Sequence, residues 1–565
     1  MDAATITEKL KSLNVNLDDY QNDDISKDFQ TLFQIIEALQ AENEKLKSKL
    51  EAALNEIGRL KGHDVQPSEK PGNKKDHSDI SSEKERKKRD LNNQKNETSK
   101  AKKHKIQIDR IEVCEIDKNS LPADAEFKGH QEYVVQEIII KTDNVKYLRE
   151  VYWSYSEKKT YIADLPVGIK GEFGPGIKSM AMIQKHVCNM SEPKIEEFFQ
   201  NVGIYISQST ISRILTKGED VEIFHQEKVE IFKAGLVSTP YQQIDGTGAK
   251  VKGENYHVQI ICNPYYSTFF TLPHKDRLSI LDILLCGAPR QYFFNEAAFD
   301  LLDIFRLSRK MIDQIHDSLF GKIIDENQMR IEIERLFPKP GSGKNSRLRI
   351  MEAGAIAYYH TQTEIPVVPF LLSDNGPEYK RITEEQGLCW IHEGRSYKKL
   401  KPVVPLYQDE VDNFLTRYWD YYEKLLLYKE NPSPEMAQSL SIEFDQIFSS
   451  HTMYDELNER IAKTSARKSE LLLVLKYPEL PLHNNMAELG ARAQARKRDV
   501  SLHTITEEGT KSQDTFMTIA QTAKKLGVSV YKYIKDRISR KFEMPSLASL
   551  IPQIKTSPKI ILDSS

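Results

Sequence analysis

Apolar residues recur at alternating intervals of three and four positions in the N-terminal part of the chain. With Phe29 at position a of a heptad, leucines occupy most d positions, and Asn43 is the polar residue at a central a position. A stripe this narrow predicts a parallel two-stranded coiled coil over residues 28–61, with the asparagine fixing its register. The alternative is a single amphipathic helix that packs on its own domain, for which a broader apolar face would be expected.

The pattern changes twice after this helix. Residues 61–105 hold 14 Lys or Arg against 8 Asp or Glu and hardly any apolar residue, so 62–105 is predicted to be a disordered, net-basic linker. In region 106–165, the segments EYVVQEIIIKT (132–142) and REVYWSYSEKKTYIADLP (149–166) are β-branched and aromatic and predict paired strands. Residues 1–27 form a tail that lacks the apolar core of a signal peptide.

Region 166–235 is predicted to be helical and to contain a helix-turn-helix at residues 192–217. Gly203 lies in the turn, Ser207 is a favoured N-cap, and Ile211 and Leu215 would face inward. Short polar and basic residues would then occupy the other side of the second helix, which suits a recognition helix in a DNA major groove. These candidate DNA-binding residues are Gln208, Ser209, Ser212, Arg213 and Lys217. A helical hairpin without DNA contacts has the same inward pattern, so that interpretation stays open.

Three consecutive segments further along predict antiparallel strands with short connections. They are YQQIDGTGAKV (241–251), NYHVQIICN (255–263) and YSTFFTLP (266–273). Asp245 lies in the middle of the first of them, which makes it a candidate for a site on a sheet.

Two more acidic residues follow at informative positions. IPVVPFLLSDNGPEY (365–379) is apolar enough to predict a buried, parallel strand that ends at Asp374, and LCWIHEGR (388–395) is a candidate for the next strand. Glu488 is predicted to lie on a helix that starts at one of two asparagines, Asn484 or Asn485.

Carboxylates on a strand, at the end of a neighbouring strand and on a helix can hold two divalent cations roughly 3.5–4 Å apart for phosphodiester chemistry. Mg²⁺ prefers such oxygen ligands. The cations after Glu488 would then bind the phosphate backbone: Arg492, Arg496, Lys497 and Arg498. Each acid alone has an ordinary explanation, as a turn former or as a charge in a first helical turn.

Composition narrows the class of protein. The net charge is −3 with 29% charged residues, so any nucleic-acid binding must come from local basic segments. The five cysteines are scattered and form no CxxC pair, which argues against a disulfide framework and fits a reducing cytosol. No apolar run approaches the roughly 20 residues that span a bilayer. We therefore expect a soluble, cytoplasmic protein with no membrane partner.

Longer motifs around the acids resemble transposases of the insertion-sequence 66 family. LPLHNNMAELGARAQARKR (480–498) is similar to the family's catalytic-glutamate motif, in which an Asn-Asn pair precedes the Glu and arginines follow it. LLSDNGPEY with CWIHEGRSYKKL (371–400) resembles its second-aspartate segment, and IDGTGAKV (244–251) resembles its first-aspartate strand. The order of the parts also matches, and the resemblance covers nearly the whole chain from residue 28.

The resemblance implies an RNase H-like fold with a DDE triad of Asp245, Asp374 and Glu488. These three residues would be both the catalytic residues and the ligands of two Mg²⁺ or Mn²⁺ ions per active site. Further DNA contacts would come from the segment after Asp374: Arg395, Lys398 and Lys399. Residues that would support the ligands are Thr247, His392, Asn484 and Asn485. For His392, a DNA contact and a structural role also stay open, and Trp390 is expected in the core.

The sequence departs from the family pattern in several places. Only Cys114 remains between residues 106 and 165, where the family's ribbon usually has four cysteines, so no structural zinc is expected. His483 replaces a common Asp, Leu489 replaces an Arg, and Gly246 follows the first aspartate instead of Glu. We interpret this pattern as a divergent branch with its triad intact, while domestication or inactivity stays open.

The overall prediction is a multidomain protein with an α/β RNase H-like catalytic core. The core begins in residues 236–400, which include a long helical excursion (278–352) with a basic loop, PKPGSGKNSR. Because 113 residues separate Asp374 from Glu488, most of 401–479 is predicted to be an all-helical insertion. The catalytic-glutamate helix at 480–500 and a C-terminal helical region and tail at 501–565 complete the chain.

The expected function is that of a prokaryotic, nucleoid-associated DNA transposase. Its partners would be double-stranded DNA, at the element ends and at the target, and further copies of itself in a homodimer or higher homo-oligomer. Accessory proteins encoded by the element are left open. Two alternatives also predict DNA binding, namely a catalytically inactive, dimeric DNA-binding protein derived from a transposase, and an RNase H-like nuclease that cuts without joining.

Overall fold

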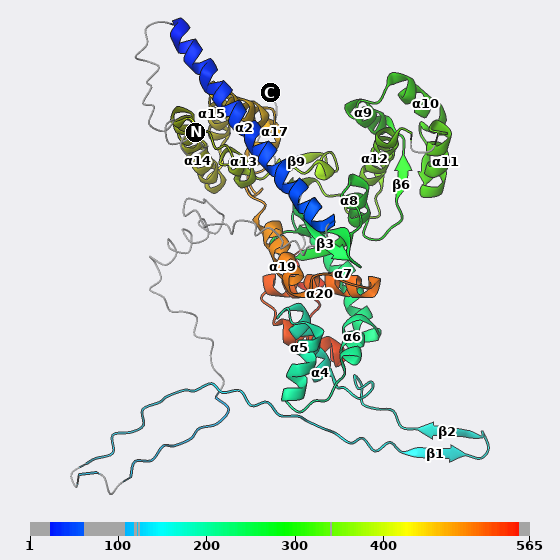
Figure 1. Ribbon diagram of the computed structural model, residues 1–565. Helices are drawn as coiled ribbons and strands as arrows, with labels where there is room; N and C mark the ends of the chain where they lie inside the picture. Colours follow the sequence, from blue (N-terminus) through cyan, green and yellow to red (C-terminus); the bar gives the residue numbers. More distant parts are fainter. Residues whose placement is uncertain (1–22, 61–107, 118–120, 123–124, 340–341, 553–565) are drawn as a thin grey trace.

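A computed structural model describes residues 23–60, 108–117, 121–122, 125–339 and 342–552. A central sheet is flanked by two helical lobes and a helical domain, and a hairpin projects away from the body (Figure 1). Among the described helices, none combines the length and the apolar character needed to cross a membrane. The predicted linker, most of the predicted N-terminal tail and residues 553–565 lie outside the described residues.

The central sheet has five strands in the order β5-β4-β3-β8-β9. The antiparallel strands β3 (Tyr241–Val251), β4 (Glu254–Cys262) and β5 (Ser267–Leu272) confirm the three strands predicted in sequence. β8 (Phe370–Ser373) is buried and runs parallel to β3, as predicted, and β9 (Glu385–Leu388) lies parallel to β8. The result is a mixed α/β core.

One face of the sheet is covered by α19 (Asn485–Ser501) and α20 (Glu507–Lys525). Val258, Ile260 and Phe269 of the sheet pack there against Met517 of α20. Gly490 marks the place where α19 crosses β4, since a Cβ atom there would lie 2.7 Å from Cγ2 of Ile260. A side chain at this position would therefore push α19 away from the sheet.

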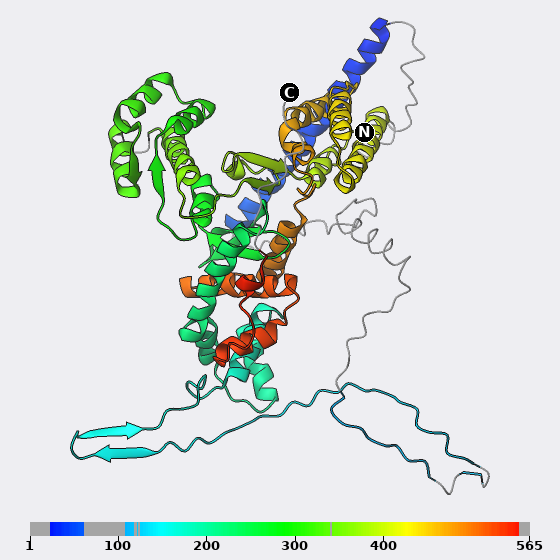
Figure 2. The same cartoon turned by 180° about the vertical axis from the view of Figure 1, so that it is seen from behind.

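The helical domain on the other side of α20 contains the two helices for which a helix-turn-helix was predicted (Figure 2). Its helices are α4 (Pro175–His186), α5 (Glu192–Asn201), α6 (Gln208–Thr216) and α7 (Glu219–Leu236), with α21 (Val530–Ile538) and α22 (Leu547–Leu550) packed beside them. Gly203 has a φ of +78° between α5 and α6, a value that favours glycine. The predicted N-cap is confirmed, because the Ser207 side chain accepts a hydrogen bond from the N–H of Thr210.

The insertion predicted at 401–479 is helical. It contains α14 (Pro405–Glu430), α15 (Pro434–Phe448), α16 (Asp455–Ser465), α17 (Lys468–Leu471) and α18 (Leu473–Lys476), and α13 (Trp390–Tyr397) precedes it. The predicted strand at 388–395 is wrong, because β9 ends at Leu388 and α13 follows. Cys389 is the N-cap of α13 and its Sγ accepts from the N–H of His392. Trp390 is fully buried among aromatic rings, as expected.

The excursion between β5 and β8 is mostly helical, with α8 (Arg277–Leu284), α9 (Glu296–Ile304), α10 (Arg309–Leu319), α11 (Glu326–Leu336) and α12 (Lys344–Thr361). The sequence did not predict its small antiparallel ribbon of β6 (Gln291–Phe293) and β7 (Ile323–Asp325), since three-residue strands carry no readable periodicity. The predicted basic loop is shorter than expected, because α12 begins at Lys344.

The N-terminal helix α2 (Asp23–Leu60) confirms the predicted helix but not its pairing. Phe33 is buried against Tyr407, with ring centroids 6.2 Å apart, and Oε1 of Glu37 accepts from the N–H groups of Val403 and Val404 at 2.6 and 2.8 Å. The start of α2 thus packs on the insertion of its own chain, as in the alternative interpretation. Leucines further along the helix are 58–61% exposed: Leu39, Leu46, Leu50 and Leu54. The coiled coil stays a prediction.

The segment 149–166, predicted to contain strand, forms a hairpin within itself, with β1 (Val151–Ser154) antiparallel to β2 (Lys159–Ile162). The strand predicted at 132–142 is wrong. This segment forms no ladder with any described strand, and Tyr133 and Ile139 are 89% and 83% exposed. β-branched composition alone does not make a strand, because a strand also needs a partner and a second layer to cover its apolar face.

Candidate active site

The register of the sheet brings Asp245 and Asp374 to neighbouring strands at the same level. β3 and β8 pair in parallel with Tyr241 beside Phe370 and Gln243 beside Leu372. Two residues further along each strand, the same register leads to Asp245 and to Asp374, which follows directly after β8. Side chains alternate between the faces of a sheet, so residues in steps of two share a face. Asp245 also pairs with Ile260, the residue under α19, so it lies on the face that α19 covers.

The helix that carries Glu488 is fixed to β3 by two hydrogen bonds at its start. Nδ2 of Asn484 donates to the carbonyl of Ile244 at 2.7 Å, and the N–H of Met486 donates to Oε1 of Gln243 at 3.1 Å. Asn484 stands at the N-cap position, as predicted, but its side chain makes no capping bond and instead joins the helix to the strand. Glu488, one turn into the helix, is therefore held above the strand that carries Asp245.

The pKa of Asp245 reflects how near the other two acids lie. The pKa of Asp245 is raised from 3.8 to about 7, mainly by burial and also by the negative charges of Asp374 and Glu488. The N–H of Gly246 and the Lys275 ammonium act in the opposite direction. Like charges disfavour ionisation of a carboxyl group, as burial does. Three acids from distant parts of the sequence therefore act on one another across this face.

The carboxylates are close enough to interact but not grouped for ligation. Among the described residues, no three His, Cys, Asp or Glu side chains lie in an arrangement that would hold a metal ion. Glu488 instead pairs with Arg395 of α13, with Nη1 of the arginine and Oε1 of the glutamate 3.4 Å apart. The donor set itself consists of carboxylate oxygens, which suits a hard divalent cation such as Mg²⁺ or Mn²⁺.

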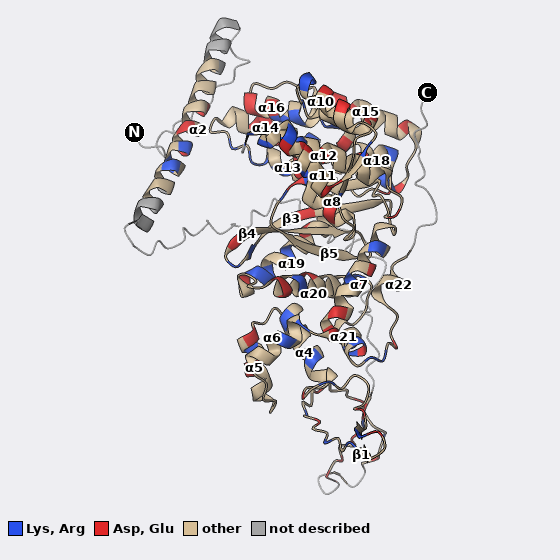
Figure 3. Cartoon of the chain, turned by 90° about the vertical axis from the view of Figure 1, so that its right-hand side faces the viewer, with Lys and Arg blue, Asp and Glu red and all other residues tan. Residues whose placement is uncertain are grey.

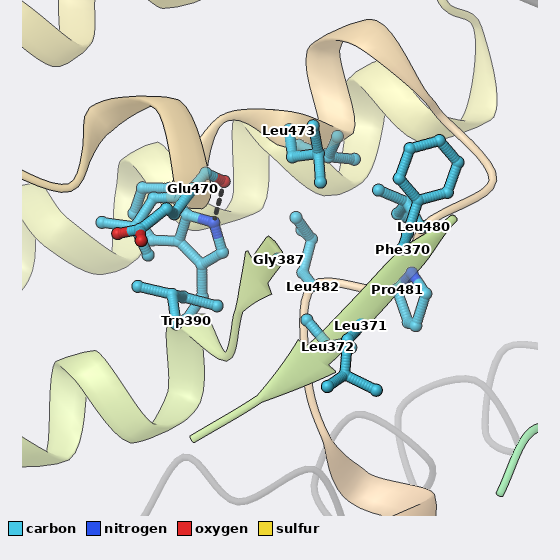
Figure 4. Close-up of a pocket in the computed structure, with 13 residues that line it drawn as sticks. Phe370, Leu371, Leu372, Gly387, Trp390, Glu470, Leu473, Leu480, Pro481 and Leu482 are labelled. Carbon is cyan, nitrogen blue, oxygen red and sulfur yellow. Dashed lines mark hydrogen bonds between the residues drawn. The ribbon is translucent and has the colours of Figure 1, made fainter. Parts of the chain in front are cut away.

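The two helix starts around this ion pair are joined to each other. The N–H of Trp390 donates to the carbonyl of Leu482 at 2.9 Å, and Sγ of Cys389 accepts from the N–H of Asn484 at 3.3 Å. Trp390 also donates from Nε1 to the carbonyl of Leu471 (Figure 4). The apolar cavity beside it has a volume of about 10 Å³, which is too small for a ligand, so this part of the structure is packing and not a binding site.

The predicted phosphate-binding residues of α19 do not form one exposed row. Arg492 and Arg496 are exposed, and Arg498 donates to the carbonyl of Gly248. Basic positions along α19 are blue in Figure 3. The prediction for Lys497 is wrong, because its side chain is only 1% exposed and its Nζ donates to the carbonyl of Lys185 on α4. It occupies the inward side of the helix, where burial lowers its pKa to about 7.

The candidate DNA-binding helix α6 has its polar side in solvent. Gln208, Ser209, Arg213 and Lys217 are exposed, and Ser212 is half-buried. Ile211 and Leu215 are buried, as the sequence predicted. The other predicted DNA contacts follow Asp374 in the sequence. Arg395 is half-buried in its pair with Glu488, Lys398 is half-buried and Lys399 is exposed.

The residues predicted to support the metal ligands lie on three different elements and differ in burial. Asn485 is buried at the first position of α19, Thr247 is half-buried on β3, and His392 is half-buried on α13 with its backbone bonded to Cys389. Sequence reasoning missed Gln243, although it lies two residues before Asp245 on the same face of β3. It also missed Lys275, which acts on Asp245 and pairs with Glu378 at 2.8 Å, and no pattern in the sequence signals it.

Comparison with known proteins gives two matches. The family model described as "Transposase IS66 family" matches residues 368–512, a range that contains Asp374 and Glu488 but not Asp245. The uncharacterized protein y4jO of Sinorhizobium fredii (strain NBRC 101917 / NGR234) is 32% identical over 313 residues, which cover 54% of this chain and 94% of that relative.

Proposed function

This chain belongs to the IS66 family of transposases, and we propose that it is a DNA transposase that cleaves and joins phosphodiesters at the ends of an insertion sequence. The proposed catalytic residues are Asp245, Asp374 and Glu488, on an RNase H-like core. Its partner is double-stranded DNA, and its reaction belongs in the prokaryotic cytoplasm, where the element and its target lie.

The observation that carries this proposal is the register of β3 and β8 beneath the start of α19. It brings two aspartates to the same level of adjacent parallel strands and sets the helix of the glutamate above them. The strand order β5-β4-β3-β8-β9, with three antiparallel strands followed by two parallel ones, supports the RNase H-like interpretation. A turn-forming aspartate and a helix-end glutamate alone would not require this convergence.

The three carboxylates would hold two Mg²⁺ or Mn²⁺ ions. Bound there, the ions would stabilise charge on the attacking and leaving oxygens of a phosphodiester. The chain's own contribution is to fix the ligands: β3 and β8 orient the aspartates, and the hydrogen bonds of Asn484 and Met486 orient the helix of Glu488. The exposed Arg492 and Arg496 follow on the same helix and can bind the phosphate backbone.

DNA selection is proposed to come from the helical domain. The α5–α6 pair has the form of a helix-turn-helix, and the exposed residues of α6 are short and polar or basic. Such residues fit a major groove, where base edges are read by hydrogen bonds and phosphates by cations.

A strand-transfer assay tests the proposal directly. Full-length protein is incubated with labelled duplexes of the element's own ends and a target plasmid in Mg²⁺ or Mn²⁺, with the Asp245→Asn variant as the matched control. Joined products that the wild-type protein makes and the variant does not are the expected result. Cleavage without joining would identify a nuclease, and DNA binding without either would identify an inactive derivative.

One observation favours the inactive derivative as the second candidate. The carboxylates are not grouped for ligation among the described residues, and Glu488 is paired with Arg395. If this ion pair persists in the presence of a divalent ion, the three carboxylates are retained but do not bind metal. Metal binding measured on the purified protein separates the two candidates.

A further inference from the structure

The position of Arg395 carries an inference about how the proposed site accepts a metal ion, and it rests on the proposed function. We propose that Arg395 is a positioning residue that holds the Glu488 carboxylate aside in the metal-free protein and releases it to the metal site when a divalent ion binds. The arginine is thus a built-in competitor for one ligand, and once released its guanidinium is free for a DNA phosphate.

The backbone geometry fixes where the two side chains meet. The first residues of α13 and of α19 are tied by the Trp390 N–H bond to Leu482 and by the Asn484 N–H bond to Sγ of Cys389. α13 is also anchored in the insertion, because the buried Glu393 pairs with Arg460 and Arg467. Two helices pinned at a shared start hold Arg395 opposite Glu488.

The pair is suited to exchange. Nη1 of Arg395 and Oε1 of Glu488 are 3.4 Å apart, which is long for a charge-assisted hydrogen bond, and the two side chains are 37% and 23% exposed. A partly solvated pair of this kind is weak, so a divalent cation with two further carboxylates nearby can displace the guanidinium. Lys275 is the cation that acts on Asp245, and it is already paired with Glu378.

Removing Arg395 should therefore strengthen metal binding, whereas removing a structural contact would weaken it. For Arg395→Gln we expect the affinity for Mn²⁺ alone to rise about two- to fivefold, as loss of a weak competing ion pair allows. Arg309→Gln is the matched control, since it removes one cation from an exposed pair with Asp313 on α10. In a Glu488→Gln background, Arg395→Gln should give no gain, because the arginine acts through the glutamate.

The measurement is a titration of full-length protein with Mn²⁺ by electron paramagnetic resonance, without DNA, and a melting curve of each variant checks folding. Should Arg395→Gln unfold the protein, Arg395→Lys gives the milder test, with a smaller rise in affinity because a lysine keeps the charge without the guanidinium geometry. If the wild type binds Mn²⁺ and these variants bind it equally or more weakly, the proposed role of Arg395 is wrong, while the proposed metal site is retained. If the wild type binds no Mn²⁺, the proposed metal site itself is wrong.

Discussion

The charge on Asp245 should destabilise the metal-free fold at neutral and alkaline pH, and its removal should stabilise the protein. The pKa of Asp245 is about 7 in the fold against 3.8 for an ordinary aspartate. The folded state therefore binds a proton between these values that the unfolded state has lost, so stability falls as pH rises from about 4 to about 7. Asp245→Asn keeps the oxygen that accepts from the Gly246 N–H and removes only the charge.

The size of the effect follows from the same pKa values. The difference between 3.8 and about 7 corresponds to about 4 kcal/mol at pH 8.5, where the carboxyl is ionised in both states. At pH 5 the carboxyl is mostly protonated in the fold and ionised in the unfolded chain, and the effect is about 1.5 kcal/mol. The stabilisation of Asp245→Asn over the wild type should therefore grow by roughly 2–3 kcal/mol between these pH values.

Thermal denaturation in EDTA at pH 5, 6.5 and 8.5 measures this difference. Asp313→Asn, at an exposed carboxylate on α10, is the control and should show no such trend. Addition of Mg²⁺ should raise the melting temperature of the wild type at pH 8.5 and have little effect on Asp245→Asn, because the ion needs the charge. A variant that is less stable than the wild type at pH 8.5, or a difference that does not change with pH, would refute the reasoning.

The remaining predictions concern chemistry, DNA and assembly. Asp374→Asn or Glu488→Gln should abolish most cleavage and joining in the strand-transfer assay while DNA binding is kept; loss of binding together with activity would point to misfolding instead. Arg213→Ala with Lys217→Ala should lower the slope of log affinity against log salt by about two, measured by fluorescence anisotropy, and an unchanged slope would make α6 structural. Deletion of residues 1–62 should reduce the oligomer mass in sedimentation, and an unchanged mass would exclude α2 as the main contact.

The core of the site was predictable because its signals are local. A run as apolar as 365–373 predicts a buried strand, and a strand that ends in Asp-Asn-Gly ends where the chain must turn. The start of α19 was also predictable from a local signal, the pair Asn484 and Asn485. The resemblance then selected three acids among the 83 that the chain contains, which composition and spacing alone could not do.

The failures occur where a residue's role depends on distant parts of the chain. Lys497 belongs to a basic run in the sequence, yet the side of α19 on which it lies faces α4, more than 300 residues away, and is buried. Trp390 and its neighbours have strand-like composition, but the hydrogen bond to Leu482 and the aromatic core of the insertion set them in a helix. The exposed segment at 132–142 shows the reverse case: its residues favour a strand, but it pairs with no strand among the described residues.

The way α19 is held decides which part of the site can adjust to a metal ion. At its start the helix is bonded to β3 through Asn484 and Met486, and near its end it is bonded to β3 again through Arg498 and to α4 through Lys497. A shift of the whole helix would break bonds at both ends, and three of these bonds involve buried side chains, those of Asn484, Gln243 and Lys497, whose loss is costly. Rotation of the Glu488 side chain breaks only the partly exposed pair with Arg395. Closure of the site by a side chain, under the control of Arg395, is therefore the less costly route, and the helix can serve as a fixed link between the sheet and the helical domain that is proposed to bind DNA.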